Sequence, residues 1–320
     1  MLKIKHIASK LALLLYLLIF VFAGYFAYSH YKTNLQDVTK EVKNRLSLDV
    51  NIQKESLEKY YATMESEIIF LAQTGSLKLG LDTFKTTWAE LGKNASLKLR
   101  LAYIENNPFK ERSKLLNAKS SITYDILHEA MHVYLRELQQ MRRYEDILLL
   151  DMDGNVIYSV QKRDNFAKNV KDIGGNLQKI FKKIHKNSQK ESIVFEDFGK
   201  DGKSYIATAI VDEMGDKIGI VAFELGDEVF EKYSVNRLSS KEDCKQKSDQ
   251  NSTHFLAFSC LEFKDNYWGI NEVESIKKVY APVKEKFYEL LKIFIILAIF
   301  SLALSYLVLE KLLGQKDEDE

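Results

Sequence analysis

The sequence predicts an α+β protein in which a long helical stem leads into an antiparallel sheet, with one apolar helix near either end of the chain. Three observations carry this prediction. Residues 11–29 and 293–309 are apolar and contain no charge. Apolar residues recur at helical spacing from residue 32 to about 76, and beyond residue 146 the pattern changes to the period of strands.

Both apolar stretches are long enough to cross a membrane. A helix rises about 1.5 Å per residue, so the first stretch crosses a hydrocarbon core of roughly 30 Å, and the second does so once Leu290, Leu291 and a snorkelling Lys292 are included. We therefore expect transmembrane helices at residues 11–31 and 288–309.

The first stretch could instead be a cleaved secretory signal, because Lys3, Lys5 and Lys10 precede it. A cleaved signal has an apolar core of about 7 to 15 residues and a small-x-small exit. This stretch is longer, and it leaves through an interfacial aromatic belt of Tyr25, Phe26, Tyr28 and Tyr31. We favour the uncleaved helix. Residues 1–10 are then cytoplasmic, and the outer region is periplasmic if the membrane is a bacterial inner membrane.

Residues 310–320 form a short acidic tail with room for no soluble domain, so we expect this chain to have no output module and to act through a membrane partner. The 46 basic and 45 acidic residues nearly balance, which predicts no nucleic-acid binding. A hydrophobic fraction of 46% and only two prolines argue against disorder.

The helical half of the outer region comprises residues 32–145. Its stem helix continues the membrane span, and the apolar stripe of the stem permits both dimerisation and packing against the chain's own sheet. A second helix contains Phe84, Trp88 and Leu91, and a short third one at Leu101–Ile104 stops at the cluster Asn106-Asn107-Pro108. A further helix covers about residues 121–141, and the candidates for its buried face are Ile126, Met131, Leu135 and Leu138.

The strand-rich half comprises residues 146–225. A β-hairpin is predicted at its start. It consists of an apolar run at residues 146–151, the turn dipeptide Asp153-Gly154 and an alternating stretch at residues 156–160. Further strands are expected at residues 192–198, 204–211 and 217–225, with a turn at 200–203 and one helical connection near 177–185. This order predicts an antiparallel sheet with helices on one face. Residues 226–286 follow as a short membrane-proximal segment.

A series of short motifs occurs along this region in a fixed order. The motifs are YIENNP at 103–108, Tyr124 with His128 and His132, YEDI at 144–147, DGNVIYSV at 153–160, residues 162–169, FEDF at 195–198 and KIGIVAF at 217–223. From about Phe84 to Leu225 the series resembles the Cache-type sensor domain of methyl-accepting chemotaxis receptors. The resemblance implies a PAS-like sheet that binds a small extracytoplasmic ligand and passes a displacement down the helix into the membrane. Many such receptors carry a second, membrane-proximal sheet domain, for which this chain leaves room only for a remnant.

The string His128-Glu129-Ala130-Met131-His132 fits H-E-x-x-H. On a helix, residues four apart share a face, so both imidazoles could hold one zinc while Glu129 activates a water. The similar sensors carry the two histidines without needing the glutamate, and no third ligand follows at a recognised spacing. We therefore expect no enzyme and no cofactor. His128 and His132 remain candidates for a non-catalytic metal or ligand contact.

Ligand contacts in a PAS-like sheet come from the start of the first strand, the segment after the hairpin and the inward positions of central strands. The residues selected in this way are Tyr144, Asp146, Tyr158, Lys162, Asp164, Phe166, Asp197 and Tyr205. Carboxylates suit an amine, and Lys162 or Arg163 would suit an acid, so the set leaves the ligand's charge open. Each residue could instead cap a turn or hold the sheet together.

Cys244 and Cys260 are the only cysteines, and both lie in the region placed outside the membrane, where a disulfide persists. We expect a disulfide between them, with free buried cysteines as the alternative. Closing a loop of about fifteen residues should contribute about 3 kcal/mol in the chain-entropy description.

The function expected from these observations is small-ligand sensing or recognition, related to chemotaxis and relayed through a membrane signalling partner or a homodimer. A different class of function is a ligand-free scaffold within an envelope complex such as a flagellar motor or receptor array. A zinc hydrolase would depend on the one motif.

Overall fold

The computed structural model describes residues 2–120, 122–187, 192–198, 202–227, 235–245, 249–250 and 253–314. Ser121, residues 200–201 of the expected turn and the end of the acidic tail lie outside this description. The chain divides into two units. One comprises Met1–Ile52, Lys245–Ser259 and Ile270–Glu320, and the other comprises Gln53–Cys244 and Cys260–Gly269.

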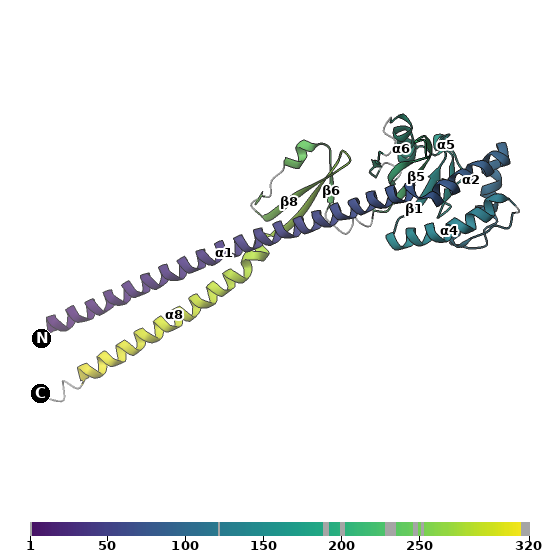
Figure 1. Ribbon diagram of the computed structural model, residues 1–320. Helices are drawn as coiled ribbons and strands as arrows, with labels where there is room; N and C mark the ends of the chain where they lie inside the picture. Colours follow the sequence, from purple (N-terminus) through teal and green to yellow (C-terminus); the bar gives the residue numbers. More distant parts are fainter. Residues whose placement is uncertain are drawn as a thin grey trace. The chain divides into compact units, whose positions relative to one another are not determined.

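The first helix, α1 (Leu2–Gln73), is continuous over 72 residues (Figure 1). The prediction that the stem continues the first apolar stretch is therefore confirmed. Its inward residues follow the helical period and are buried, as shown by Val42, Leu46, Val50, Leu57, Tyr61, Met64, Ile68 and Leu71. At its end the Thr74 hydroxyl donates to the carbonyl of Leu71, which satisfies one of the carbonyls left over by the last turn.

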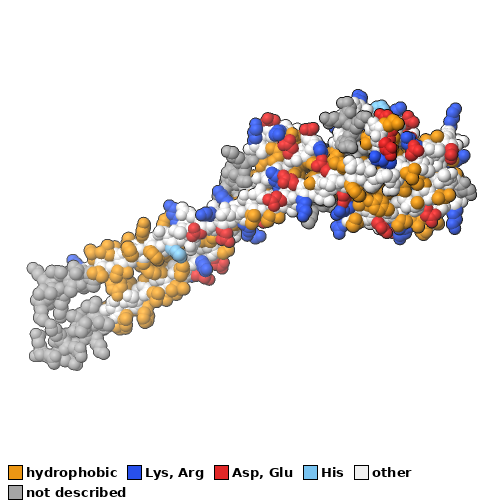
Figure 2. All heavy atoms as spheres, in the orientation of Figure 1, with side chains coloured by type: hydrophobic (Ala, Val, Ile, Leu, Met, Phe, Trp, Pro, Cys, Tyr) orange, Lys and Arg blue, Asp and Glu red, His pale blue; other side chains and the backbone are white. Residues whose placement is uncertain are grey.

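The unit that contains both ends of the chain includes the long helix α8 (Ile276–Gly314). Both α1 and α8 contain a stretch that is long and apolar enough to cross a membrane. Figure 2 shows hydrophobic side chains covering these stretches, whereas charged side chains of both signs intermingle over the rest of the described chain. The Tyr16 hydroxyl lies 2.7 Å from the Ser305 hydroxyl, and the Ser301 hydroxyl donates to Tyr16, so polar groups also join the two helices.

The second unit is built on a five-stranded antiparallel sheet of order β2-β1-β5-β4-β3. Its strands are β1 (Asp146–Leu150), β2 (Val156–Ser159), β3 (Val194–Glu196), β4 (Ser204–Val211) and β5 (Lys217–Leu225). The predicted hairpin is present, and Gly154 occupies its turn at φ +87°, a conformation that favours glycine. The α+β fold class and the antiparallel sheet are thereby confirmed.

Helices cover both faces of this sheet, so the prediction of helices on one face is wrong. On one face, α5 (Val170–Ile173) and α6 (Gly175–Lys186) cover an apolar cluster that includes Leu148, Leu150, Val156, Leu177, Ile180, Ile184, Ile220 and Ala222. On the other face lie α2 (Gly75–Leu91) and α4 (Thr123–Arg142). The reason is that β1 is buried along its whole length, which requires cover on both sides.

A β-bulge changes the facing of side chains along β2. Leu149 pairs with Tyr158, but the next residue, Leu150, pairs with Val156. Residues directly opposite one another point to the same face, so Val156 joins the apolar cluster under α6 and Tyr158 faces α4. The simple alternation predicted for residues 156–160 would have placed both side chains on one face.

Short helical segments connect α2 to α4. A 3-10 turn at Gly92–Asn94 precedes α3 (Ala95–Arg100), which continues as a π-helical turn at Leu101–Glu105, and a further 3-10 turn covers Arg112–Lys114. The predicted short helix therefore begins earlier than expected and stops at Asn106, before the proline as predicted.

The segment after β5 forms a four-stranded sheet of order β6-β9-β8-β7, which is more structure than the expected remnant. Its elements are β6 (Val235–Leu238), a 3-10 turn at Lys241–Lys245, β7 (Asp249–Gln250), β8 (His254–Phe263) and β9 (Asn266–Ser275). Cys244 and Cys260 form a disulfide with their Cα atoms 5.3 Å apart.

Candidate ligand site

The inner face of α4 is polar, which is unusual for a helix that covers a sheet. Its buried residues are Tyr124, Asp125, His128, His132, Leu135 and Gln139. Of the four residues expected on this face, Leu135 is buried, Met131 and Leu138 are partly buried, and Ile126 is 73% exposed. The prediction for Ile126 is wrong because the helix turns its histidine-bearing stripe, rather than its aliphatic one, toward the sheet.

Two stacked histidines form the centre of this face, with ring centroids 4.4 Å apart. In His132, Nε2 lies 2.7 Å from the Ser113 carbonyl oxygen and Nδ1 lies 2.7 Å from the Tyr158 hydroxyl. A carbonyl oxygen can only accept, so we assign the proton to Nε2, and Nδ1 then accepts from Tyr158. Burial lowers the pKa of His132 to about 3, which keeps this imidazole neutral.

The second histidine, His128, has one ring nitrogen with a partner and one without. Its Nδ1 lies 2.6 Å from the Leu116 carbonyl oxygen and must donate to it. Its Nε2 is therefore an acceptor, and it is buried without a hydrogen-bond partner among the residues that the structure describes. Burial lowers the pKa of His128 well below its usual range, and Lys162 lowers it further. The free acceptor thus stays available rather than becoming protonated.

The ammonium group of Lys162 is buried beside these rings. Its Nζ donates to the Val160 carbonyl at 3.1 Å and lies 3.4 Å and 3.5 Å from the two ring nitrogens of His132. The same Nζ lies about 6 Å from the ring centres of Tyr103 and Tyr158. Within the described residues no carboxylate forms an ion pair with Lys162, and burial lowers its pKa to about 7, although the nearby charge of Asp146 opposes this decrease. The structure thus holds a buried cation with unused donor capacity.

Asn165 supplies further polar groups without partners. Its side chain is 5% exposed, and neither its amide nitrogen nor its amide oxygen has a hydrogen-bond partner within the described chain. Its neighbour Phe166 packs edge-on against Tyr103, which in turn lies against His128. Unsatisfied buried polar atoms cost free energy, so each requires an explanation such as a water or a ligand.

Two arginines hold the segment that follows β2. Arg100 donates to the backbone oxygens of Asp164 and Phe166 at 3.2 Å and 2.9 Å, and Arg112 donates to the backbone oxygen of Lys162 at 3.2 Å. In these contacts both arginines donate only to backbone carbonyl oxygens. They position the segment without occupying the Lys162 ammonium.

Of the eight residues predicted to contact a ligand, Tyr158, Lys162 and Phe166 lie in this cluster. Asp146 lies at the margin of the cluster. Its carboxylate accepts from the Ser159 hydroxyl at 2.6 Å and from the backbone N–H of Gln161 at 3.0 Å. Burial raises the pKa of Asp146 to about 6, although those hydrogen bonds oppose the rise. Asp164 contributes its backbone oxygen, while its side chain is exposed.

The other predicted residues have different surroundings. The Tyr205 hydroxyl donates to Glu224 at 3.0 Å, and Glu224 in turn pairs with Arg163. Asp197 accepts from the indole nitrogen of Trp268 at 3.2 Å and from Nε of Arg237 at 2.7 Å.

Tyr144 connects α4 to the stem. It stacks on Phe223 in β5 with ring centroids 4.4 Å apart, and its hydroxyl donates to Glu67 of α1 at 2.6 Å. Burial raises the pKa of this hydroxyl well above its usual range, so it stays protonated and able to donate.

The H-E-x-x-H motif does not assemble into a metal site in this arrangement. Glu129 points outward, where its carboxylate accepts from Asn117 at 2.9 Å, while the two histidines point inward. Both ring nitrogens of His132 already have partners. No group of three or more His, Cys, Asp or Glu side chains suited to a metal occurs among the residues the structure covers.

Two members of the cluster, Tyr103 and Asp125, were not predicted from the sequence. Neither was Asn165, which is buried and precedes Phe166 in the chain. The Asp125 carboxylate accepts from the Tyr103 hydroxyl at 2.7 Å and from the Ser120 hydroxyl at 2.8 Å. Tyr103 lies in one of the motifs that carry the Cache resemblance, which was an available signal. Asn165 lies in another of these motifs, at residues 162–169, but nothing in the sequence marks its side chain as buried.

No protein-family model and no curated protein matches the sequence. Several solved sensor domains are similar to the structure. The extracellular domain of a histidine-kinase candidate is 10% identical, with 78% of this chain and 96% of that one covered and a TM-score of 0.44. The ligand-binding domain of the Pseudomonas fluorescens chemoreceptor CtaA, in complex with L-isoleucine, is 13% identical, with 78% and 98% covered and a TM-score of 0.40. The periplasmic sensory domain of the Campylobacter jejuni chemoreceptor Tlp1 is 10% identical, with 77% and 99% covered and a TM-score of 0.40.

Proposed function

We propose that this chain is a membrane-anchored sensory protein whose α+β domain binds a small ligand in the polar cluster beneath α4. The observation that carries the proposal is the buried ammonium of Lys162, which lacks an ion-pair partner among the described residues. Burying a cation without a direct ion-pair contact is costly, and apolar packing would stabilise the fold better. Such groups concentrate at functional sites.

The free hydrogen-bonding capacity of the cluster indicates the ligand's chemistry. Lys162 offers donors, which suit a carboxylate, and Nε2 of His128 offers an acceptor, which suits a hydroxyl or amino group. The carboxylate of Asp146 already accepts hydrogen bonds from the protein. The ligand that fits is a small carboxylic acid with a nearby hydroxyl or amino group. The other predicted contacts, Tyr144, Asp197 and Tyr205, bond to other parts of the protein and have structural roles.

Ligand binding can reach the membrane through α1. Glu67 of this helix pairs with Arg142 at the end of α4 and accepts from the Tyr144 hydroxyl. A shift of α4 about a ligand therefore changes the contacts of α1, which runs without interruption into the apolar stretch. We place the sensing domain in the periplasm of a bacterium and the helices in its inner membrane. The partner is a membrane signalling protein of the chemotaxis class, engaged by this chain as a homodimer.

The test is a thermal-shift screen of the full chain in detergent against small hydroxy acids, amino acids, amines of matched size and metal ions. A ligand at a hundred times its dissociation constant should stabilise the fold by about 2.7 kcal/mol. We expect acids to give this shift. It should disappear in Lys162→Met and persist in Lys171→Met, a matched change of an exposed lysine.

Two results would contradict the proposal. Stabilisation by amines alone would place the ligand on a carboxylate rather than on Lys162. No shift with any class of compound would favour the scaffold function within an envelope complex.

A further inference from the structure

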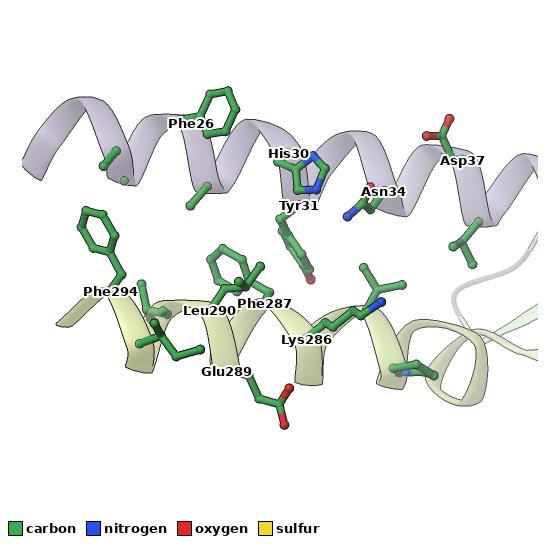
Figure 3. Close-up of a pocket in the computed structure, with 18 of the residues that line it drawn as sticks. Phe26, His30, Tyr31, Asn34, Asp37, Lys286, Phe287, Glu289, Leu290 and Phe294 are labelled. Carbon is green, nitrogen blue, oxygen red and sulfur yellow. The ribbon is translucent and has the colours of Figure 1, made fainter. Parts of the chain in front are cut away.

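The helices α1 and α8 contact each other through aromatic rings and leave a gap alongside those contacts. Phe20 lies 5.6 Å from Phe294, and Tyr31 lies 4.6 Å from Phe287, measured between ring centroids. Beside these contacts is a cavity of about 920 Å³, lined from Ala23 to Val38 on α1 and from Pro282 to Leu297 on α8, with Tyr31 and Phe287 midway along it (Figure 3). All of its lining residues belong to the unit that holds both helices.

The α1 side of the gap is lined by Ala23, Gly24 and Ala27. Small residues in membrane helices usually let a neighbouring helix approach closely. Here a Cβ atom added to Gly24 would meet no atom within 4 Å. The small residues therefore leave open space instead of forming a helix contact.

The gap is apolar along most of its length and polar at the end nearer the outer region, where His30, Asn34 and Lys286 line it. Two acidic residues, Asp37 and Glu289, belong to the same end, but Figure 3 shows both carboxylates pointing away from the opposite helix. The side chain of Lys286 lies along the gap in this view. An apolar groove with a cation at one end is complementary to an amphipathic molecule with an anionic head.

The size of the cavity distinguishes a lipid from a helix. A volume of about 920 Å³ is within the range of small-molecule sites, roughly 300 to 1,000 Å³. A helix about 10 Å in diameter would fill this volume with about two turns, much less than a membrane span. The groove fits an acyl chain better than a helix of a partner or of a second copy.

We propose that this gap binds one phospholipid of the surrounding bilayer, with an acyl chain along Ala23, Gly24 and Ala27 and the phosphate at Lys286. The inference rests on the membrane placement proposed above and is independent of the ligand beneath α4. The bound lipid would fill the space between the two helices through which the domain is anchored. Its presence would set their spacing.

The test is native mass spectrometry of the full chain, extracted in mild detergent and supplied with either phosphatidylglycerol or a diacylglycerol of the same chains. We expect the phospholipid to be retained and the diacylglycerol to be lost. Gly24→Leu should reduce retention about tenfold, and Lys286→Gln should do the same through the loss of one charge-assisted hydrogen bond. The controls are Ala303→Leu and Lys284→Gln on α8, which change residues outside the cavity lining.

Gly24→Leu is not expected to unfold the helix, because leucine has the higher helix propensity and the added side chain meets open space. Ala27→Leu provides a second filling variant. Equal retention in Gly24→Leu and Ala303→Leu would overturn the site, and equal retention of diacylglycerol would overturn the phosphate contact. A dimer that is lost in Gly24→Leu would show instead that a second copy fills the gap. Recovery of the chain in the soluble fraction would refute the membrane placement itself, whereas failed acid binding would refute only the sensing function.

Discussion

The two faces of the five-stranded sheet are buried to a similar degree but by opposite chemistry. Beneath α6 the contacts are aliphatic, with Leu148, Ile180 and Ile220 all fully buried. Beneath α4 the buried groups include His128 and Lys162, whose polar atoms have few partners. On the first face every buried methylene group stabilises the fold, whereas on the second each polar group left unsatisfied destabilises it.

The difference indicates how the domain divides its tasks. An apolar face tolerates many sequences of similar volume, so nothing about stability requires a lysine and two histidines on the other face. A buried polar network that is only partly satisfied weakens the fold until its partners are supplied. The comparison therefore predicts that changes on the two faces shift stability in opposite directions.

The largest effect is expected from Ile180→Ala on the apolar face. Removing buried aliphatic atoms leaves a cavity beneath α6, so the free energy of unfolding should fall by about 2 to 5 kcal/mol. Urea unfolding followed by tryptophan fluorescence measures this change, because Trp88 and Trp268 both lie in this unit. A loss below about 1 kcal/mol would mean that this face adds little to stability.

A stabilising effect is expected from Lys162→Met on the polar face. Methionine retains much of the length and packing of lysine without the buried charge, so the unliganded domain should gain about 1 to 4 kcal/mol. The same urea unfolding at about pH 6.5 measures the gain. A loss of stability would show that the ammonium contributes more to the fold than its desolvation costs. Substitutions on both faces would then lower stability, and the comparison would fail.

The pH dependence of stability gives an intermediate effect of defined sign. Burial lowers the pKa of Lys162 to about 7, against about 10.4 in the unfolded chain, so the unfolded state binds more protons between these values. Stability should therefore rise with pH from about 7.5 to 9.5, by up to about 1.4 kcal/mol per unit. In Lys162→Met this contribution is absent. If the stability of wild type and of Lys162→Met changed with pH in the same way, Lys162 would not be a buried cation with a lowered pKa.

The smallest effect is expected from Glu129→Gln. Glu129 is exposed on the opposite side of α4 from the histidines, so this change should alter stability by no more than about 0.5 kcal/mol. Metal analysis of wild-type protein should find well under one zinc per chain. A stoichiometric zinc that is lost in His132→Ala would instead place a metal on the polar face.

Much of the fold could be predicted from the sequence because it is expressed in local periodicity and turn chemistry. The strands β4 and β5 have the predicted bounds, and the hairpin at Gly154 follows from a glycine in a left-handed turn. The buried face of α4 could not be predicted in the same way. Ile126 is apolar and correctly spaced, yet it is exposed, because spacing defines a stripe on a helix without saying which stripe the sheet contacts.

The candidate site was predictable in part. Tyr158 and Lys162 were selected for their positions near the hairpin, and the structure brings them together with His132. Asp197 was predicted as a strand position of the sheet, but its partner Arg237 lies 40 residues farther along the chain. Which charges meet over such separations depends on the packing of the two sheets.

The sequence alone determined most helices and strands as far as β5, where the apolar stretches lie and which side chains could do chemistry, because these properties depend on neighbours a few residues away. Only the tertiary structure decided that the bulge in β2 turns Tyr158 away from Val156 and toward α4. It also decided that Lys162 is buried without an ion-pair contact among the described residues. Both outcomes depend on contacts between distant segments, where a shift of one residue in register moves a side chain to the other face of the sheet.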